Sequence, residues 1–302
     1  MSIATLLLPD FLLILLGFVL ARKANWGGHF WSGVEKIVYF LMFPALLFYT
    51  TSRTPFDFHA TGTLLKIAMA ATTCAMLLGW LGKPMFTAAP RVFESGVQTA
   101  FRFNSYIGLA LASRLAGDQG TALIALLIGF LVPLCNMAAV YALAHDSGKL
   151  LKEIAQNPLV VATACGLIVN LCDIPIPEAI NATLSRLGNA SIALGLLAVG
   201  AGLRLSALHE AKAMASYFLT IKLLALPAIA LSLGLYMGLP ALQLQILVIF
   251  CSLPTASSAY VLAARMGGNG PFVAFLISAG TLLSLVSLPF WLMATRAILG
   301  VG

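Results

Sequence analysis

The chain has 302 residues, of which 61% are hydrophobic and only 9% are charged, and its formal net charge is +7. Soluble globular domains carry about 25% charged residues, so this composition excludes a soluble fold and predicts an integral membrane protein. The residue alternation of an outer-membrane barrel is absent from the sequence, which leaves membrane-spanning helices as the expected elements.

Runs of about 20 apolar residues can span a bilayer as helices, and ten such runs follow one another along the chain. The first is expected to be a retained helix, not a cleaved signal peptide, because its basic residues, Arg22 and Lys23, follow the apolar run. The predicted fold class is an all-α integral membrane protein with ten transmembrane helices. Their expected ranges are 3–21, 33–51, 61–82, 94–116, 121–143, 158–172, 179–203, 213–237, 242–265 and 272–296.

Basic residues near the span ends indicate how the chain is oriented. Ten Lys and Arg residues lie on one side of the predicted spans, against about four on the other side. By the positive-inside rule the richer side is cytoplasmic, so both termini are expected to face outward. The net positive charge then faces anionic lipid and requires no nucleic acid partner.

Three pairs of similar positions indicate an internal repeat. Gly17 and Gly166 are 149 positions apart, His59 and His209 are 150 apart, and LASRLAG (111–117) matches LAARMGG (262–268) at 151. We expect a first repeat at 1–144, a cytoplasmic linker at 145–157 and a second repeat at 158–302. Because each half holds five spans, the second half is expected to be inverted, an arrangement typical of secondary transporters.

Two predicted spans contain polar interruptions at equivalent depths. In SLPTASSAY (252–260), Pro254 removes a backbone donor and breaks the helix, and Thr255, Ser257 and Ser258 place hydroxyl groups there. A shift of 151 positions leads to FRFNSYIG (101–108), where Asn104 and Ser105 favour non-helical geometry. Broken membrane helices must line a cavity or be buried in protein, so these residues are the predicted substrate site.

Ionisable residues within membrane spans are functional candidates. Lys222 and Arg102 lie well inside two predicted spans, and Asn136 adds an interior amide. The carboxylates, Glu35 among them, are expected at span ends or in loops. Interior positive charge with hydroxyls and amides suits an anion, most simply a carboxylate. The alternative for Lys222 is a structural role, donating to carbonyls freed at a break.

Motifs for catalysis or cofactor binding are absent. The four histidines have no ligand spacing, no phosphate-binding glycine loop is present, and the five cysteines are expected to be small buried side chains. We therefore expect no enzyme activity, no cofactor and no bound metal. Coupling to protons or to sodium stays open.

Several stretches together resemble the auxin efflux carrier family, within the bile, arsenite and riboflavin transporter superfamily. They are LLGFVLARK, MFPALLF, FRFNSYIGLALASRLAG, KEIAQNPLVVATACGLIVN, ASIALGLLAVGAGLRL and SLPTASSAYVLAARMGGNG. The short central linker resembles that of bacterial members, which implies the cytoplasmic (inner) membrane.

This resemblance implies a sodium/proton-antiporter-like fold, with a scaffold of spans 1, 2, 6 and 7 and a transport domain of spans 3–5 and 8–10. Spans 4 and 9 would cross at the binding site, and an elevator-type motion would move malonate, malate or an auxin-like acid. A homodimer through the scaffold is also implied. Asn104 and Pro254 match the crossover positions of the family, although span 4 lacks the proline that plant carriers have there.

The sequence thus favours a secondary transporter of a small organic anion. The alternatives are a sodium-coupled carrier of bile-acid type and, from another class, a membrane-embedded sensor or enzyme. The absence of a catalytic group at depth disfavours the last of these.

Overall fold

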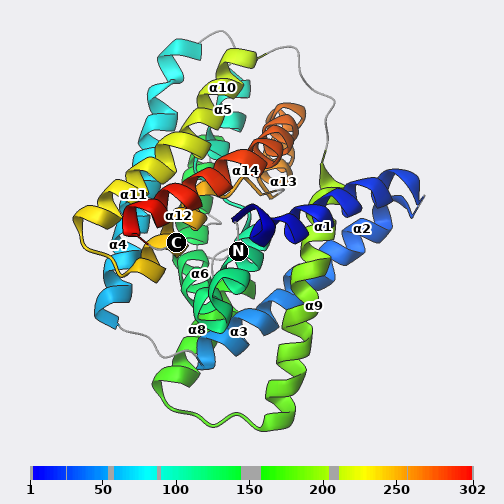
Figure 1. The fold of residues 1–302 in the computed structure, drawn as a ribbon. Helices are drawn as coiled ribbons and strands as arrows, with labels where there is room; N and C mark the ends of the chain where they lie inside the picture. The colour runs from blue at the N-terminus through cyan, green and yellow to red at the C-terminus, as the bar shows by residue number, and fades with distance from the viewer. Residues whose placement is uncertain are drawn as a thin grey trace. The chain divides into compact units, whose positions relative to one another are not determined.

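The computed structural model describes residues 3–24, 26–53, 58–86, 90–143, 158–203, 211–256 and 258–300. Every regular element in these ranges is helical (Figure 1). The first half contains α1 (Ile3–Lys23), α2 (Gly27–Ile37), α3 (Phe43–Arg53), α4 (Phe58–Leu81), α5 (Pro90–Gly96) and α6 (Ser105–Leu143). The second half contains α8 (Pro158–Leu171), α9 (Glu178–Gly202), α10 (Lys212–Thr220), α11 (Leu226–Tyr236), α12 (Ala241–Ser252), α13 (Ser258–Arg265) and α14 (Gly270–Leu299).

Six helical stretches among the described residues are long and apolar enough to cross a membrane. Two shorter apolar helices cover Val161–Leu171 and Ala241–Ser252. The described residues thus agree with the expected all-α, multi-pass class. Ten crossings and an inverted repeat stay predictions. The six long stretches are Gly27–Arg53, Thr61–Phe86, Pro90–Leu143, Glu178–Gly202, Lys212–Tyr236 and Gly270–Leu299.

The second apolar stretch begins earlier than the sequence pattern indicates. Helix α2 starts at Gly27 and continues through a π-helical turn, η1 (Val38–Met42), into α3, so one stretch runs to Arg53. Glu35 therefore lies inside a helical stretch and not at its first turn, and its expected place at the end of a membrane span stays a prediction. Polar residues such as His29 and Ser32 hid the start because they lower the local hydropathy.

The chain forms two compact units. The first comprises Met1–Phe58, Tyr106–Phe130 and Leu151–Gly202. Within it, α1 packs on α9, and α3 packs on α8 and α9 (Figure 1). The contacts depend on small residues, because a Cβ atom at Gly17 would overlap the backbone of Leu197, and one at Gly200 would overlap the carbonyl of Ile14. Glycines of this kind let membrane helices approach closely.

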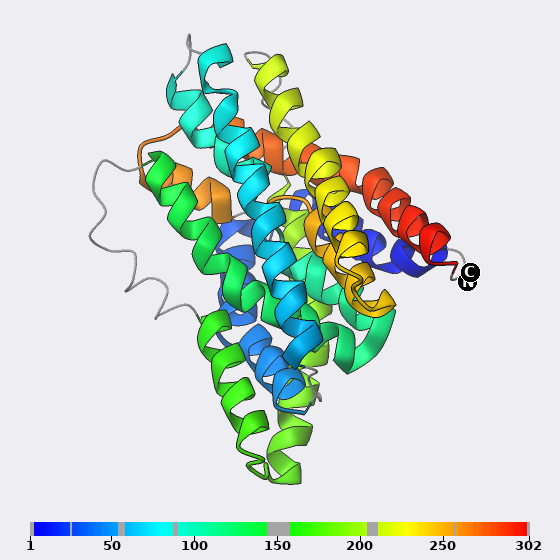
Figure 2. The same ribbon diagram turned by 90° about the vertical axis from the view of Figure 1, so that its left-hand side faces the viewer.

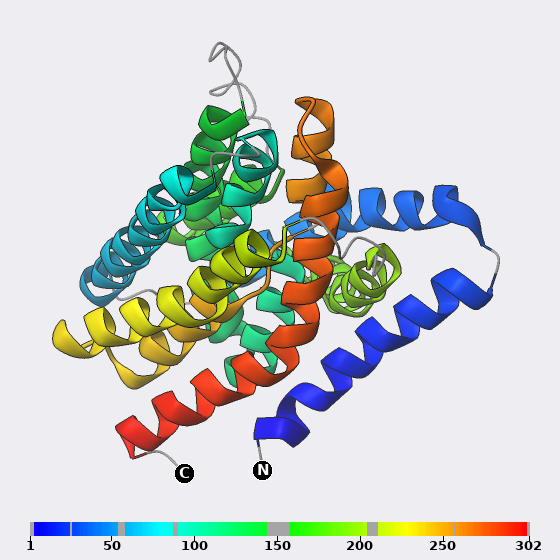
Figure 3. The same ribbon diagram turned by 90° about the horizontal axis from the view of Figure 1, so that it is seen from above.

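The second unit comprises His59–Ser105, Leu131–Leu150 and Leu203–Gly302. In it, α10 and α11 form one rod joined by a π-helical turn, η4 (Ile221–Ala225), as Figure 2 shows. Helix α12 packs beside both α11 and α14 (Figure 3). This unit contains both interrupted segments and all the predicted site residues that the structure describes.

Candidate functional site

The first break lies between α5 and α6. Helix α5 tightens into a 3-10 turn, η3 (Val97–Ala100), residues 102–104 have no regular structure, and α6 begins at Ser105. The buried hydroxyl of Thr99 donates to the carbonyl oxygen of Gly96 at 2.7 Å, a local bond that competes with regular helix geometry. The break therefore forms without a proline.

The second break follows α12. The chain becomes extended at Leu253, and α13 begins at Ser258. The residue before a proline is pushed towards extended geometry, and Pro254 has no N–H group to offer the carbonyl of Phe250. That carbonyl accepts a 3.3 Å bond from the N–H of Leu253 instead.

Hydrogen bonds join the two breaks directly. The backbone N–H of Asn104 donates to the carbonyl oxygen of Pro254 at 2.8 Å. The hydroxyl of Thr255 donates to the carbonyl oxygen of Thr99, also at 2.8 Å. Residues about 150 positions apart therefore satisfy one another's backbone groups, as a break within a membrane requires.

Arg102 links the two broken helices through its side chain. One terminal nitrogen donates to Oε1 of Gln98 at 3.3 Å, and the other donates to Oγ of Ser258 at 3.1 Å. Gln98 is fully buried, and its own Nε2 donates to the carbonyl oxygen of Ala259 at 3.3 Å. Arg102 is 8% exposed, and its guanidinium is held by neutral oxygen atoms at both of these bonds.

Lys222 lies in the π-helical turn between α10 and α11. The residue is 2% exposed, and its Nζ donates to the carbonyl oxygen of Cys251 at 3.2 Å. Cys251 is the penultimate residue of α12, so the ammonium group lies at the helix end that precedes the second break.

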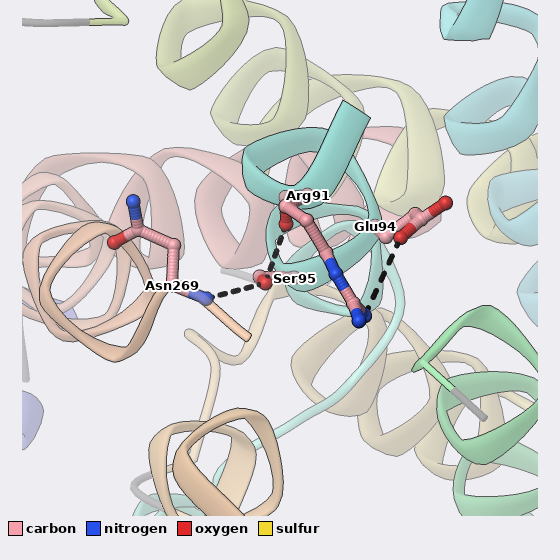
Figure 4. A network of polar contacts seen from close by, with 4 residues as sticks. All are labelled: Arg91, Glu94, Ser95 and Asn269. Atoms are coloured by element: carbon pink, nitrogen blue, oxygen red, sulfur yellow. Dashed lines mark hydrogen bonds and ion pairs between the residues drawn. The ribbon is translucent and has the colours of Figure 1, made fainter. Parts of the chain in front are cut away.

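A second set of polar contacts lies away from the breaks, between α5 and the segment that joins α13 to α14. The hydroxyl of Ser95 in α5 accepts a 2.7 Å bond from the N–H of Asn269 and donates to the carbonyl of Arg91 (Figure 4). The side chain of Asn269 accepts from the N–H of Phe272 and thereby caps α14. Arg91 also forms a 3.9 Å ion pair with Glu94. This network ties α5 to the turn between α13 and α14.

The predicted site residues divide into three groups. Arg102, Asn104, Pro254, Thr255 and Ser258 come together at the breaks. The three others that the structure describes lie apart from these bonds: Lys222 contacts the end of α12, Ser105 is half-buried at the start of α6, and Asn136 is half-buried on α6. Ser257 lies outside the described residues.

Sequence reasoning missed Gln98 and Cys135, which bond to the breaks, and Ser95, which bonds to the turn before α14. Gln98 holds Arg102, Ser95 holds Asn269, and the thiol of Cys135 lies 3.7 Å from the carbonyl oxygen of Phe101. A buried glutamine four residues before Arg102 was a usable signal, because residues at that spacing share one helix face. The expectation that every cysteine is buried is wrong for Cys165 and Cys172, which are exposed.

The arrangement provides hydrogen-bond donors and positive charge, with the chain's broken backbone at its centre. Within the described ranges, no group of three or more His, Cys, Asp or Glu side chains could hold a metal ion.

The family model described as "Membrane transport protein" matches residues 142–292. The chain is also 25% identical to the "Putative malonate transporter" of Rhizobium meliloti (strain 1021), over 88% of this chain and 87% of that protein.

Two further relatives match this chain over nearly the whole length of both proteins. An "Uncharacterized transporter" of Methanothermobacter thermautotrophicus is 26% identical over 92% of this chain and 94% of its own. The "Uncharacterized transporter YfdV" of Escherichia coli (strain K12) is 24% identical over 97% of both chains. Because the family model covers half of the chain and the likeness extends over most of it, this chain belongs to the membrane transport protein family, that of the auxin efflux carriers.

Proposed function

We propose that the protein is a secondary transporter or facilitator that moves a small organic anion across the membrane. The substrate would be a mono- or dicarboxylate such as malonate or malate, or an auxin-like acid. The observation that supports this most is the Arg102 guanidinium, buried at the meeting point of two broken helices and bonded to neutral Gln98 and Ser258.

In this proposal a substrate carboxylate bonds to Arg102 and replaces its bond to Ser258. The bond to Ser258 has a charge on the donor alone, whereas a carboxylate brings the opposite charge and can accept two parallel N–H bonds from a guanidinium, so the exchange is favourable. Ser258 is exposed, which leaves its side of the guanidinium open to an incoming group. The N-terminal ends of α6 and α13 begin at the breaks and add positive potential for the anion.

Transport would follow an elevator-type motion, in which the helices that hold the site move against a scaffold. The name of the Rhizobium meliloti relative supports a short dicarboxylate as the first substrate to test. We also propose placement in the bacterial inner membrane, with both termini outside and with a homodimer through the scaffold helices.

Proteoliposome uptake tests this function. The purified protein is reconstituted, and uptake of labelled malonate, malate and an aromatic carboxylate is followed with and without pH and sodium gradients. Saturable uptake of at least one anion is expected. If no organic anion moves under any gradient, the proposed function is wrong.

The same assay distinguishes the proposed function from the alternative of a sodium-coupled carrier of bile-acid type. It requires uptake that depends on a sodium gradient and that is abolished by replacing Asn104 or Ser258. Turnover of a candidate substrate in detergent, where no transport is possible, would instead indicate an enzyme.

A further inference from the structure

The carboxyl end of α12 has carbonyl groups that the helix itself cannot satisfy. In a continuous helix, the carbonyl of Cys251 would accept from the N–H of Thr255. The chain is extended from Leu253 onward, so this bond does not form, and the carbonyl accepts from Nζ of Lys222 instead. The negative end of the helix dipole also lies here, which favours a cation.

The structure around Lys222 holds its side chain at this helix end. The π-helical turn Ile221–Ala225 widens the α10–α11 rod, and turns of this kind are frequent at functional sites. Trp291 of α14 donates its indole N–H to the carbonyl of Leu223 at 2.8 Å and so satisfies a backbone group of that turn. In the described part of the chain, Lys222 forms no ion pair and makes this one hydrogen bond.

The corresponding end of the other broken helix has a neutral donor. The carbonyl of Phe101, 150 positions before Cys251, has the thiol of Cys135 at 3.7 Å. The position 150 before Lys222 is Thr72, a neutral residue on α4. The cationic donor is therefore a property of the α12 end and not of both repeats.

In secondary transporters with broken helices, unwound carbonyls and half-helix carboxyl ends are the groups that coordinate a coupling cation. We infer that the Lys222 ammonium group takes the place of such a cation at the end of α12, so that transport does not require sodium. This inference rests on the proposed function, because coupling has a meaning only for a transporter.

The first test uses the intact protein without transport. Wild-type protein in detergent is titrated with ²²Na⁺, and its thermal unfolding is compared in sodium, potassium and choline chloride at equal ionic strength. No saturable sodium binding and one unfolding temperature in all three salts are expected. Saturable binding, or stabilisation by sodium alone, would overturn the inference.

The second test replaces the lysine. Lys222→Gln keeps a donor but removes the charge, so uptake in choline is expected to fall by about tenfold, the usual effect of losing one charged hydrogen bond. Sodium or lithium should restore part of that uptake and should raise the unfolding temperature of this variant. Lys66→Gln is the control, because Lys66 is an exposed lysine in the same unit and should change neither quantity.

The outcomes separate the two proposals. Wild-type uptake that needs sodium overturns the inference and leaves the transport function standing. A folded Lys222→Gln variant that transports normally without sodium, or fails equally in every salt, also overturns it. If the variant does not fold, the wild-type sodium titration still decides. Absence of any anion uptake would count against the function, while the binding experiment still reports on the cation site.

Discussion

Arg102 contacts both broken helices through its two terminal nitrogens, which makes it the residue on which anion binding most depends. Replacing it with Gln removes the charge and one of the two donor groups. Because a hydrogen bond to a charged group is worth about 1.5–3 kcal/mol, uptake at low substrate concentration should fall by at least about tenfold. Uptake by Arg102→Lys should lie between that of the wild type and that of Arg102→Gln, because an ammonium group keeps the charge but cannot bond a carboxylate in the bidentate manner.

Arg91→Gln is the control for this measurement. Arg91 lies on α5, the helix before the first break, its side chain is 59% exposed, and its ion pair with Glu94 is of the surface kind that contributes little. Uptake by this variant should match the wild type. Equal losses in the Arg91 and Arg102 variants would mean that Arg102 acts through general stability and not through the anion.

Variants of Asn104 and Thr255 distinguish the contribution of the side chains at the breaks from that of the backbone. The Asn104 bond to Pro254 uses the main-chain N–H, so it survives in Asn104→Ala, and any loss of uptake reports on the carboxamide. Thr255→Val keeps the shape but removes the donor to Thr99, which should cost about 1 kcal/mol of stability. Uptake kinetics and thermal unfolding in detergent measure the two effects. Wild-type transport in both variants would place the site elsewhere.

At the scale of elements, the contact between α1 and α9 depends on glycine. Gly17→Leu would force a side chain into the backbone of Leu197, and overpacking of this kind typically costs 1–3 kcal/mol. The variant should unfold at a lower temperature than the wild type. Gly33→Ala in α2 is the control, because nothing lies within 4 Å of the added carbon, and a helical Gly→Ala change there should stabilise the protein slightly. Similar unfolding temperatures for both variants would contradict this account of the packing.

Two helix contacts within the first unit are spaced by the offset of the predicted repeat, which stays a prediction. Gly17 of α1 meets Leu197 of α9, and Gly166 of α8 meets Phe48 of α3. Gly166 lies 149 positions after Gly17, and Leu197 lies 149 positions after Phe48, so the second contact repeats the first at an offset found in the sequence. Helix α6 is kinked at Gly117, where the backbone is non-helical, and α13 ends two residues before Gly267; both glycines have positive φ. A duplicated chain is expected to reuse its helix contacts and turns in this way.

At the scale of the whole molecule, the distribution of basic residues predicts that both ends of the chain face outward. Single cysteines introduced near residue 2 and residue 301, in a chain whose five native cysteines are replaced, should react with a membrane-impermeant maleimide in intact cells. A cysteine introduced in the linker at 145–157 should react only after the cells are opened. The reverse pattern would show that the orientation is inverted.

Composition and local pattern alone determined the class of this protein and the places where its helices break. A chain with 9% charged residues has too little polar surface for water, and Pro254 removes a backbone donor wherever it lies. These properties act over a few residues, so they can be read without the fold. The early start of α2 at Gly27 could not be read this way, because its first turns are polar.

The partners at the breaks were decided only by the tertiary structure. Nothing local indicates that Arg102 bonds to Ser258, which is 156 positions away, or that Lys222 donates to Cys251 across 29 positions. The sequence left two roles open for Lys222, positive charge for an anion or a bond to a carbonyl freed at a break. In the structure Arg102 bonds to both broken helices, while Lys222 donates to the end of α12. The physical reason is that a break exposes backbone groups that must find partners in a medium without water, and those partners come from whichever segments the fold brings beside them.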